Sequence, residues 1–232
     1  MRVTSQGLRP GVRVFAGVPR RRAVRETYER IAPHFAKTRP EPWDEVETFL
    51  SDRSGEVGLD VGAGNGRHAE LLATSVDRVV AVDASRAALR TAEDRATERR
   101  FGLAPCMGDA SRLPVGNSVV DLAVYVATIH HLPSRESRVA SLDEMARVLA
   151  PGGAAIVSAW SVTHDRFDRE SAFDTEVDWT LPDGETVPRF YHVYDGEEFA
   201  ADLRRSDLRA ETVFESHGNY YGVVAPPGVA EE

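Results

Sequence analysis

The sequence predicts a single α/β domain in which a mostly parallel sheet is covered by helices on both faces. From residue 56 to residue 160, short apolar runs alternate with helical patterns, which is typical of a parallel sheet. The chain has 232 residues, of which 42% are hydrophobic. This length and composition support one domain with a substantial core and exclude a disordered or fibrous chain.

Two short helices are expected before the sheet. In residues 23–35 apolar side chains recur every three or four positions, and Pro33 is expected to bend or end this helix. Pro42 suits the first turn of a second helix. We therefore expect residues 23–52 to form an N-terminal helical extension. Residues 1–22, which are rich in Arg, Gly and Pro, are expected to be a flexible basic arm.

Strands and helices then follow one another in regular order. Ser85 is expected to cap the helix after the second strand, and Pro151-Gly152-Gly153 to end the helix before the fifth strand. The predicted strands are 56–61, 78–82, 103–107, 118–126 and 154–160, and the predicted helices are 67–75, 85–97 and 134–149.

The pattern is less regular after residue 160. Residues 161–186 are polar and acidic and are expected to be an inserted loop. A closing pair of strands would add an antiparallel edge to the sheet, as in many mixed sheets. The domain is thus expected to span residues 23–225 and to end in a tail, 226–232. The last predicted elements are strands at 188–194, 209–215 and 219–225, and a helix at 196–206.

Charge is distributed unevenly along the chain. The net charge is -9, but residues 1–39 carry ten basic residues against only Glu26 and Glu29, so this stretch is +8 and the remainder is -17. Clustered arginines attract phosphates, which makes the basic arm a candidate nucleic-acid contact. A solvated tail is the alternative reading of the same charges. Lys37 is the only lysine, which fits either salt adaptation or a nucleotide bias toward arginine.

Several classes of protein are excluded by simple counts. The single cysteine, Cys106, excludes an internal disulfide and a Cys-based zinc site. No apolar run is long enough to cross a bilayer, and the polar N-terminus lacks the apolar core of a secretory signal. We therefore expect a cytoplasmic protein with no membrane contact.

The strongest local motif is Asp60-Val61-Gly62-Ala63-Gly64-Asn65-Gly66, which ends the first predicted strand and opens a helix. Glycines there allow a tight turn and a close approach of the backbone to a ligand, although a packing turn is the alternative. Asp83 lies 21 residues after Gly62, at the end of the second strand, where an acid can accept both ribose hydroxyls. Asp109 ends the next strand.

Three acids at neighbouring strand ends favour a nucleoside with a positively charged tail over a dinucleotide. A pyrophosphate prefers a helix N-terminus free of extra carboxylates, and the x-x-G spacing of dinucleotide sites is missing. The pattern thus favours S-adenosylmethionine over NAD. We expect Asp60 near its ammonium end, Asp83 at the ribose and Asp109 at the adenine amine.

A histidine pair, His130-His131, follows the fourth strand. Ligands of open α/β sheets bind beyond the carboxyl ends of the strands, so the pair is expected at the reaction site. Adjacent residues of an extended segment point to opposite faces and cannot chelate one ion together, so no metal is expected. One histidine is expected to pack under the helix while the other touches the substrate.

These residues, together with 121–133 and 149–153, resemble the motifs of class I S-adenosylmethionine-dependent methyltransferases. The N-terminal motifs are similar to the opening of the tRNA wobble-uridine methyltransferases, which esterify 5-carboxymethyluridine at position 34, and to the methyltransferase half of their AlkB-fused animal relatives. The resemblance covers most of residues 24–225 and departs from the family at Ala63, His68 and the short loop before Val187. The motifs that carry it are Tyr28-Glu29-Arg30-Ile31-Ala32-Pro33-His34-Phe35, Thr38-Arg39, Pro42-Trp43, Phe49-Leu50, Ser158-Ala159-Trp160, Arg189-Phe190-Tyr191-His192-Val193-Tyr194 and Gly218-Asn219-Tyr220-Tyr221-Gly222-Val223-Val224.

The resemblance implies a seven-stranded Rossmann-like methyltransferase sheet and methyl transfer from S-adenosylmethionine to the carboxylate of 5-carboxymethyluridine. It also implies two partners: a tRNA anticodon stem-loop and a small zinc-binding activator subunit, with no metal in this chain. The cofactor-binding residues expected are Asp60, Gly62, Gly64, Gly66, Asp83, Asp109, Ala110 and Ala127.

Chemistry suggests roles for the other residues. The acceptor carboxylate is ionised near neutral pH, so a cation must orient it, and Arg39 fits because a guanidinium binds carboxylates bidentately. Trp160 and Tyr191 are expected to stack on or border the uracil, and His131 to bond the carboxymethyl group or the uridine edge. The catalytic candidates are Arg39, His131 and Trp160; the substrate-binding candidates are Tyr28, His34, Arg39, His130, Arg189 and Tyr191; Arg20, Arg21, Arg22 and Arg25 are expected to hold anticodon-stem phosphates.

Two alternative functions remain open on the sequence. The first is a methyltransferase that acts on a small molecule such as a quinone precursor, because the glycine motif and the histidine pair recur in that group. The second is a catalytically silent RNA-binding subunit of the same fold, against which the three acids and three glycines stand. A hydrolase finds no support, because G-x-S-x-G is missing.

Overall fold

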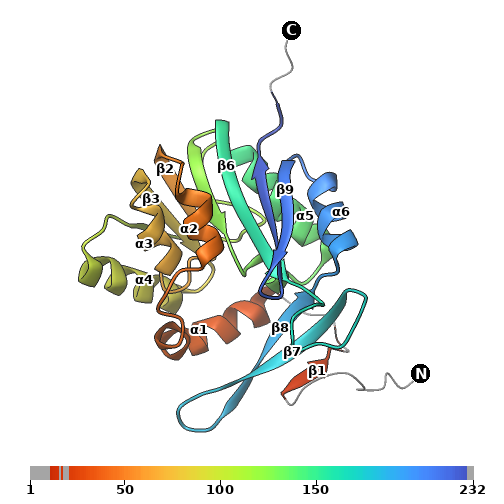
Figure 1. Cartoon of the computed structure of the whole chain (residues 1–232). Coiled ribbons are helices and arrows are strands. Elements are labelled where there is room, and N and C mark those ends of the chain that lie inside the picture. Colours follow the sequence, from red (N-terminus) through yellow and green to blue (C-terminus); the bar gives the residue numbers. More distant parts are fainter. Residues whose placement is uncertain (1–10, 16, 18–20, 229–232) are drawn as a thin grey trace.

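The computed structural model describes residues 11–15, 17 and 21–228, and its central feature is a seven-stranded sheet (Figure 1). The strand order is β4-β3-β2-β5-β6-β10-β9, in which the first five strands are parallel and β10 pairs antiparallel with both β6 and β9. This confirms the predicted fold class and its antiparallel C-terminal edge. The strands are β2 (Gly55–Val61), β3 (Val76–Asp83), β4 (Ala104–Met107), β5 (Val120–Tyr125), β6 (Leu149–Trp160), β9 (Arg209–Ser216) and β10 (Asn219–Ala225).

Helices cover both faces of this sheet, as the alternating pattern predicts (Figure 1). Ser85 and Ser134 cap α4 and α5 by accepting a hydrogen bond from the backbone N–H three residues later, which satisfies one of the free donors of each first turn. The helices are α1 (Arg21–Lys37), α2 (Asp44–Leu50), α3 (Arg67–Leu72), α4 (Arg86–Arg99), the 3₁₀ turn η1 (Ile129–His131), α5 (Arg135–Val148) and α6 (Gly196–Arg205).

The core is divided between the two faces because side chains alternate along each strand. Val80 and Val82 of β3 pack with the cluster under α5 and α6, whereas Val79 packs with the cluster under α2 and α3. Ala81 contacts Leu89 of α4 on that second face. The central strands are therefore apolar on both faces, which is why they read as continuous apolar runs in the sequence.

A second, smaller sheet was not predicted. The strands β1 (Val12–Val14), β7 (Phe173–Thr180) and β8 (Thr186–Val193) pair antiparallel in the order β1-β7-β8. The expected loop at 161–186 thus contains the whole of β7, and part of the expected flexible arm forms β1. Thr175 and Val177 are buried at alternate positions of β7, but the acidic residues between them hid this period. The rest of residues 1–20 lies largely outside the described residues.

Helix α1 lies across the carboxyl ends of the parallel strands and contacts α4 and β8 (Figure 1). It runs through Pro33, which we expected to bend or end it. Ile31 and Ala32 are buried on this helix, and their packing outweighs the hydrogen bond that a proline removes. Among the described residues, no helix is long and apolar enough to cross a membrane.

Candidate cofactor and substrate site

A cavity of about 1150 Å³ lies between α1 and the carboxyl ends of the parallel strands. It is larger than the roughly 300–1,000 Å³ of a typical single-ligand pocket and has room for a nucleoside cofactor and an acceptor base together. Three predicted residues do not line it: Asp60, Gly66 and His34. The predicted residues that line it are Tyr28, Arg39, Gly62, Gly64, Asp83, Asp109, Ala110, Ala127, His130, His131, Trp160, Arg189 and Tyr191.

The three glycines of the β2–α3 turn have different functions. Each has a positive φ, but a Cβ on Gly62 would collide with Thr128, and a Cβ on Gly66 would press on Ala92 of α4. These two glycines allow close packing. At Gly64 a Cβ would meet only the Gly62 carbonyl oxygen, at 3.9 Å, so the open side of Gly64 is where a ligand can approach the backbone.

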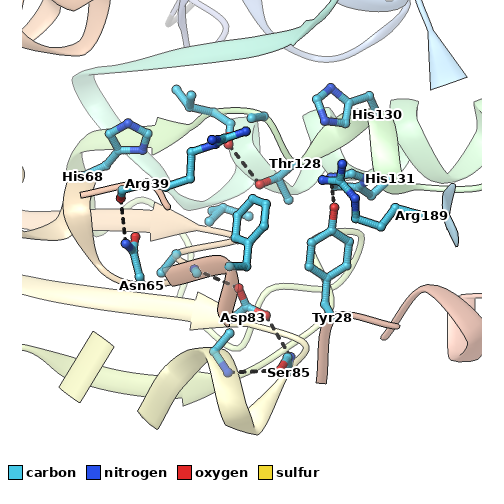
Figure 2. Close-up of a pocket in the computed structure, with 18 of the residues that line it drawn as sticks. Tyr28, Arg39, Asn65, His68, Asp83, Ser85, Thr128, His130, His131 and Arg189 are labelled. Atoms are coloured by element: carbon cyan, nitrogen blue, oxygen red, sulfur yellow. Dashed lines mark hydrogen bonds between the residues drawn. The ribbon is translucent and has the colours of Figure 1, made fainter. Parts of the chain in front are cut away.

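Asp83 is held firmly in the wall of the cavity. Its Oδ2 accepts a hydrogen bond from the Gly64 N–H at 2.9 Å, and its Oδ1 accepts one from the Ser85 N–H at 2.8 Å (Figure 2). Burial raises the pKa of Asp83 above its ordinary value, although these backbone hydrogen bonds oppose the shift. The side chain thus joins the glycine turn to the start of α4 and presents an acid at the position expected for a ribose.

Asp109 already has a cationic partner. Arg21 donates to its Oδ2 from Nη1 at 3.0 Å and also to the Ser137 Oγ at 2.8 Å, while Ser111 donates to its Oδ1. Partial burial raises the pKa of Asp109, but the bonds from Ser111 and Arg21 outweigh it and lower the pKa. Arg21, which we expected at an RNA phosphate, therefore lies at the expected adenine end, and Arg20 lies outside the described residues.

Asp60 lies behind the cavity wall. It is 2% exposed, its Oδ2 has no hydrogen-bond partner, and burial followed by repulsion from Asp83 raises its pKa to about 7. A carboxyl group with this pKa is half protonated near neutral pH. Asp60 would therefore act on a cofactor ammonium group through the electric field more than through direct contact.

The two histidines differ in burial and in their contacts: His130 is buried, and His131 is half-buried. His131 has a partner at each ring nitrogen, the Tyr28 hydroxyl at 2.7 Å from Nε2 and the Phe190 carbonyl at 2.9 Å from Nδ1 (Figure 2). Because a carbonyl only accepts, Nδ1 donates and Nε2 accepts. Burial lowers the pKa of His131 to about 3, so the ring is neutral. The Nδ1 of His130 accepts a hydrogen bond from the backbone N–H of Trp160, so His130 is held within the fold. One histidine of the pair was expected to pack within the fold in this way.

The aromatic side chains expected at the uracil stack on one another. The rings of Trp160 and Tyr191 are 4.2 Å apart and nearly parallel, so one face of each is already covered. Tyr191 is only 3% exposed, and Trp160 also contacts His164 and Phe167. Both rings border the cavity, but they are stacked too closely for a base to enter between them.

Two of the six arginines that line the cavity were predicted at the substrate, Arg39 and Arg189, and they differ in burial. Arg39 is exposed, has its guanidinium 5.6 Å from the Phe35 ring, and accepts the Asn65 side-chain amide at its backbone oxygen. Arg189 is 5% exposed and donates to the Tyr191 hydroxyl at 2.5 Å. In Figure 2 the Arg39 backbone lies beside Asn65 and its side chain extends toward Thr128, whereas Arg189 lies beside Tyr28 and His131.

Several residues of the site were missed from the sequence. Trp179 of β7 contacts Phe35 and Arg189, and it donates from Nε1 to His34, which explains why His34 lies behind the cavity wall. Arg67 of α3 stacks on Trp43. The alternation of Thr175, Val177 and Trp179 was the one local signal for the strand that carries Trp179. Within the described part of the chain, no group of three or more His, Cys, Asp or Glu side chains could hold a metal ion.

The buried Asp60 makes stability depend on pH. Its pKa of about 7 in the folded chain lies above the ordinary 3.8, so the folded state binds more protons between pH 4 and 7. The free energy of unfolding therefore falls as pH rises through this range, by up to about 4 kcal/mol from Asp60 at 1.36 kcal/mol per pKa unit. Urea unfolding from pH 4 to 8 should show this slope in the wild type and a smaller one in Asp60→Asn.

The exposed Asp52→Asn serves as a control for the loss of one charge. It should follow the wild-type curve. Parallel curves for the wild type and Asp60→Asn across pH 4 to 7 would contradict the assignment of a proton-binding group to Asp60.

Comparison with known proteins agrees with this geometry. Residues 59–157 match the family model of a methyltransferase domain. The chain is 34% identical over 155 residues to the tRNA (carboxymethyluridine(34)-5-O)-methyltransferase ALKBH8 of Macaca fascicularis, a match covering 65% of this chain and 22% of that protein. It is 31% identical over 172 residues to the tRNA (carboxymethyluridine(34)-5-O)-methyltransferase of Saccharomyces cerevisiae, covering 72% of this chain and 59% of that protein. The chain thus spans between about a fifth and three fifths of these relatives.

Solved structures share the fold at lower identity. The DhpI–SAH complex has a TM-score of 0.68 and 19% identity, and the match covers 89% of this chain and 96% of that one. A chain from the complex between the Haloferax volcanii Trm112 methyltransferase activator and a candidate methyltransferase has a TM-score of 0.65 and 15% identity, covering 90% and 100%. The chain therefore shares the fold of these solved structures, matches the methyltransferase-domain model over residues 59–157, and resembles the tRNA (carboxymethyluridine(34)-5-O)-methyltransferases.

Proposed function

We propose that this chain transfers a methyl group from S-adenosylmethionine to the carboxylate of 5-carboxymethyluridine at the wobble position of tRNA, forming the methyl ester. The observation that carries the proposal is the cavity itself. One end has the glycine turn and Asp83, and the other has neutral histidines and the buried cation Arg189. Relatives that bear the name of this activity match 65% and 72% of this chain.

The residues at the first end fit the cofactor. Gly64 leaves space at its Cα, and Asp83 beside it has the acceptor oxygens that a ribose needs. Asp83 and the ionised fraction of Asp60 add negative potential around this end, which favours a sulfonium and an ammonium group, whereas the charge of Asp109 is balanced by Arg21. When bound, S-adenosylmethionine supplies an electrophilic methyl group.

The acceptor needs alignment more than it needs a base. A carboxylate has a pKa of about 4 and is ionised near neutral pH, so no proton has to be removed before transfer. His131 suits this chemistry because both its ring nitrogens are engaged and its pKa of about 3 keeps it neutral. Its ring fixes Tyr28, and with it α1, over the cavity. The chain thus contributes orientation and the exclusion of water.

The RNA would present an extruded base at the mouth of the cavity. A wobble base lies in a loop and can be unstacked at low cost, and a base deep in a duplex cannot. Arg25 and Arg166 line the cavity and are exposed, so they are placed for phosphates on either side of the extruded nucleotide. Arg13 and Arg30 pair instead with Asp178 and Glu185.

An activator subunit is part of the proposal. A fold neighbour was solved in complex with the Trm112 methyltransferase activator. In this chain β4 is an edge strand of the sheet, and Met107 at its end is 45% exposed. An unpaired strand edge with an exposed apolar side chain is a common site of strand addition by a partner. We propose that a small zinc-binding activator covers this edge.

A hairpin assay tests the function directly. The purified chain, alone and co-expressed with a small zinc-binding activator, is given S-adenosylmethionine and anticodon hairpins that carry 5-carboxymethyluridine or uridine at position 34. We expect the methyl ester only on the carboxymethyl hairpin, detected by nucleoside mass spectrometry. Methyl transfer to small-molecule extracts but to neither hairpin would contradict the proposal and favour the quinone-precursor type of enzyme.

The dependence of the rate on pH tests the mechanism. Because the acceptor is ionised above pH 5 and the pKa of His131 is about 3, neither group titrates between pH 6 and 8.5. We expect kcat/KM for the carboxymethyl hairpin to vary by less than about twofold in this range. Because Asp60 also titrates near pH 7, the profile is measured at saturating S-adenosylmethionine and repeated with Asp60→Asn. A rise of tenfold or more with an apparent pKa of 6 to 7 in both proteins would indicate a histidine base instead.

Gly64→Ala tests the cofactor end, with Gly152→Ala as its matched control. Both glycines have positive φ and open space for a Cβ, at +56° and +85°, so both variants lose about 1 kcal/mol or more of stability. Of these two glycines, only Gly64 lines the cavity. Calorimetry with S-adenosylhomocysteine should show at least about tenfold weaker binding for Gly64→Ala and unchanged binding for Gly152→Ala. Equal affinities would place the cofactor elsewhere.

A further inference from the structure

Arg189 is a buried cation without an anion. Its side chain is 5% exposed, its Nε has no hydrogen-bond partner, and no carboxylate in the described part of the chain forms an ion pair with it. We propose that Arg189, rather than Arg39, binds the carboxylate of the acceptor and makes the site select an anionic acceptor. The identity of that acceptor rests on the proposed function.

Arg138, another buried arginine, illustrates a structural role. Arg138, which is 3% exposed, donates to Glu198 at 3.0 Å and lies 3.9 Å from Asp202, so its charge is balanced within the fold. A buried charge that lacks such a partner costs free energy and is kept where a ligand supplies the counter-charge. Arg189 has no such partner and lines the cavity, whereas Arg138 does not.

Aromatic rings hold the guanidinium of Arg189 in place. Its Cζ lies 5.0 Å from the Trp179 ring, 5.2 Å from Tyr191 and 5.8 Å from Phe35, and its Nη1 donates to the Tyr191 hydroxyl. Phe35 and Trp179 themselves are in contact. The faces of aromatic rings attract a cation, so these rings stabilise the charged guanidinium without occupying its N–H donors. The unused Nε–H can then act with an Nη–H as a fork for the two oxygens of a carboxylate.

The two histidines beside Arg189 do not compete with it for this anion. Burial lowers the pKa of His131 and of His130, so both histidines beside it are neutral. Burial also lowers the pKa of Arg189, but Tyr191 and Tyr28 outweigh this effect and raise it, so the guanidinium remains charged. One cation surrounded by neutral groups gives a steep preference for an anionic ligand over its neutral amide.

Arg39 is attached to the glycine-turn side of the cavity. Its backbone oxygen accepts a hydrogen bond from Asn65, a residue of the glycine turn (Figure 2), and its charge lowers the pKa of Arg67 on α3, after burial, to about 10. The guanidinium groups of Arg39 and Arg189 both approach the Phe35 ring, at 5.6 Å and 5.8 Å, but only Arg189 also contacts Tyr191 and Trp179. Two cations at the glycine turn suit the carboxylate of the cofactor's amino-acid portion, whereas Arg189 lies beside the histidines.

The test compares two acceptors that differ only in charge. Anticodon hairpins carrying 5-carboxymethyluridine or the neutral 5-carbamoylmethyluridine are titrated against the wild type, Arg189→Met and Arg39→Met in the presence of S-adenosylhomocysteine and any activator. We expect the wild type to prefer the carboxylate at least tenfold, Arg189→Met to lose this preference, and Arg39→Met to retain it. S-adenosylhomocysteine itself should bind Arg39→Met more weakly and Arg189→Met normally.

Folding is checked by the melting temperature and by a conservative variant. Because an unbalanced buried charge is removed, the Tm of Arg189→Met without ligand should equal or exceed that of the wild type; a purely structural arginine would give a lower Tm. Should Arg189→Met fail to fold, Arg189→Lys keeps the charge without the fork and should reduce the preference three- to tenfold. If either folded Arg189 variant still prefers the carboxymethyl hairpin as strongly as the wild type does, the inference is overturned.

Failure of the proposed function gives a different result. In that case the wild type methylates neither hairpin and shows no preference between them. The nucleoside 5-carboxymethyluridine and acetate are then titrated against the wild type and Arg189→Met. Tighter binding of both carboxylates by the wild type supports an anion site at Arg189, and equal binding by the two proteins overturns it.

Discussion

The ring of His131 is the interaction on which the site depends. A neutral imidazole has one donor and one acceptor, and here both are used between elements that are distant in sequence: Tyr28 on α1 and the Phe190 carbonyl on β8. This fixes α1 over the strand ends and brings β8, with Arg189 and Tyr191, against η1. A protonated ring could not accept from Tyr28 and would place a second charge beside Arg189. His131 must therefore be neutral for these contacts to form, whatever its part in the reaction.

The main sheet and one end of the cavity were predictable because their signals are local. Each parallel strand is an apolar run, and the carboxyl ends of such strands lie at the same edge. That is enough to bring Gly64, Asp83 and Asp109 together from three separate motifs. The capping by Ser85 and Ser134 is equally local, since it needs only a hydroxyl before a helical pattern.

The other end was not predictable in the same way because it depends on pairing across the chain. Val12 pairs with Val177, and Arg21 reaches Asp109, so the partner of each lies far along the sequence. The charged residues of β7 masked its alternation, and without that strand Trp179 had no expected place. Arg39 and Arg189 could both be named from the sequence as residues facing the substrate. Only burial and the lack of an anion distinguish the arginine that faces the acceptor.

The two ends of the cavity carry different charged groups, as the proposed reaction requires. Asp83 lies at the glycine turn, where a sulfonium would lie, and the buried cation Arg189 lies beside the histidines, where an acceptor carboxylate would lie. Transfer of the methyl group converts this pair of ions into a neutral thioether and a neutral ester. Loss of charge is easier in a site that excludes water than in bulk solvent, because fewer solvating contacts are given up. The ester also no longer pairs with Arg189, so the same buried charge that selects the acceptor favours release of the product.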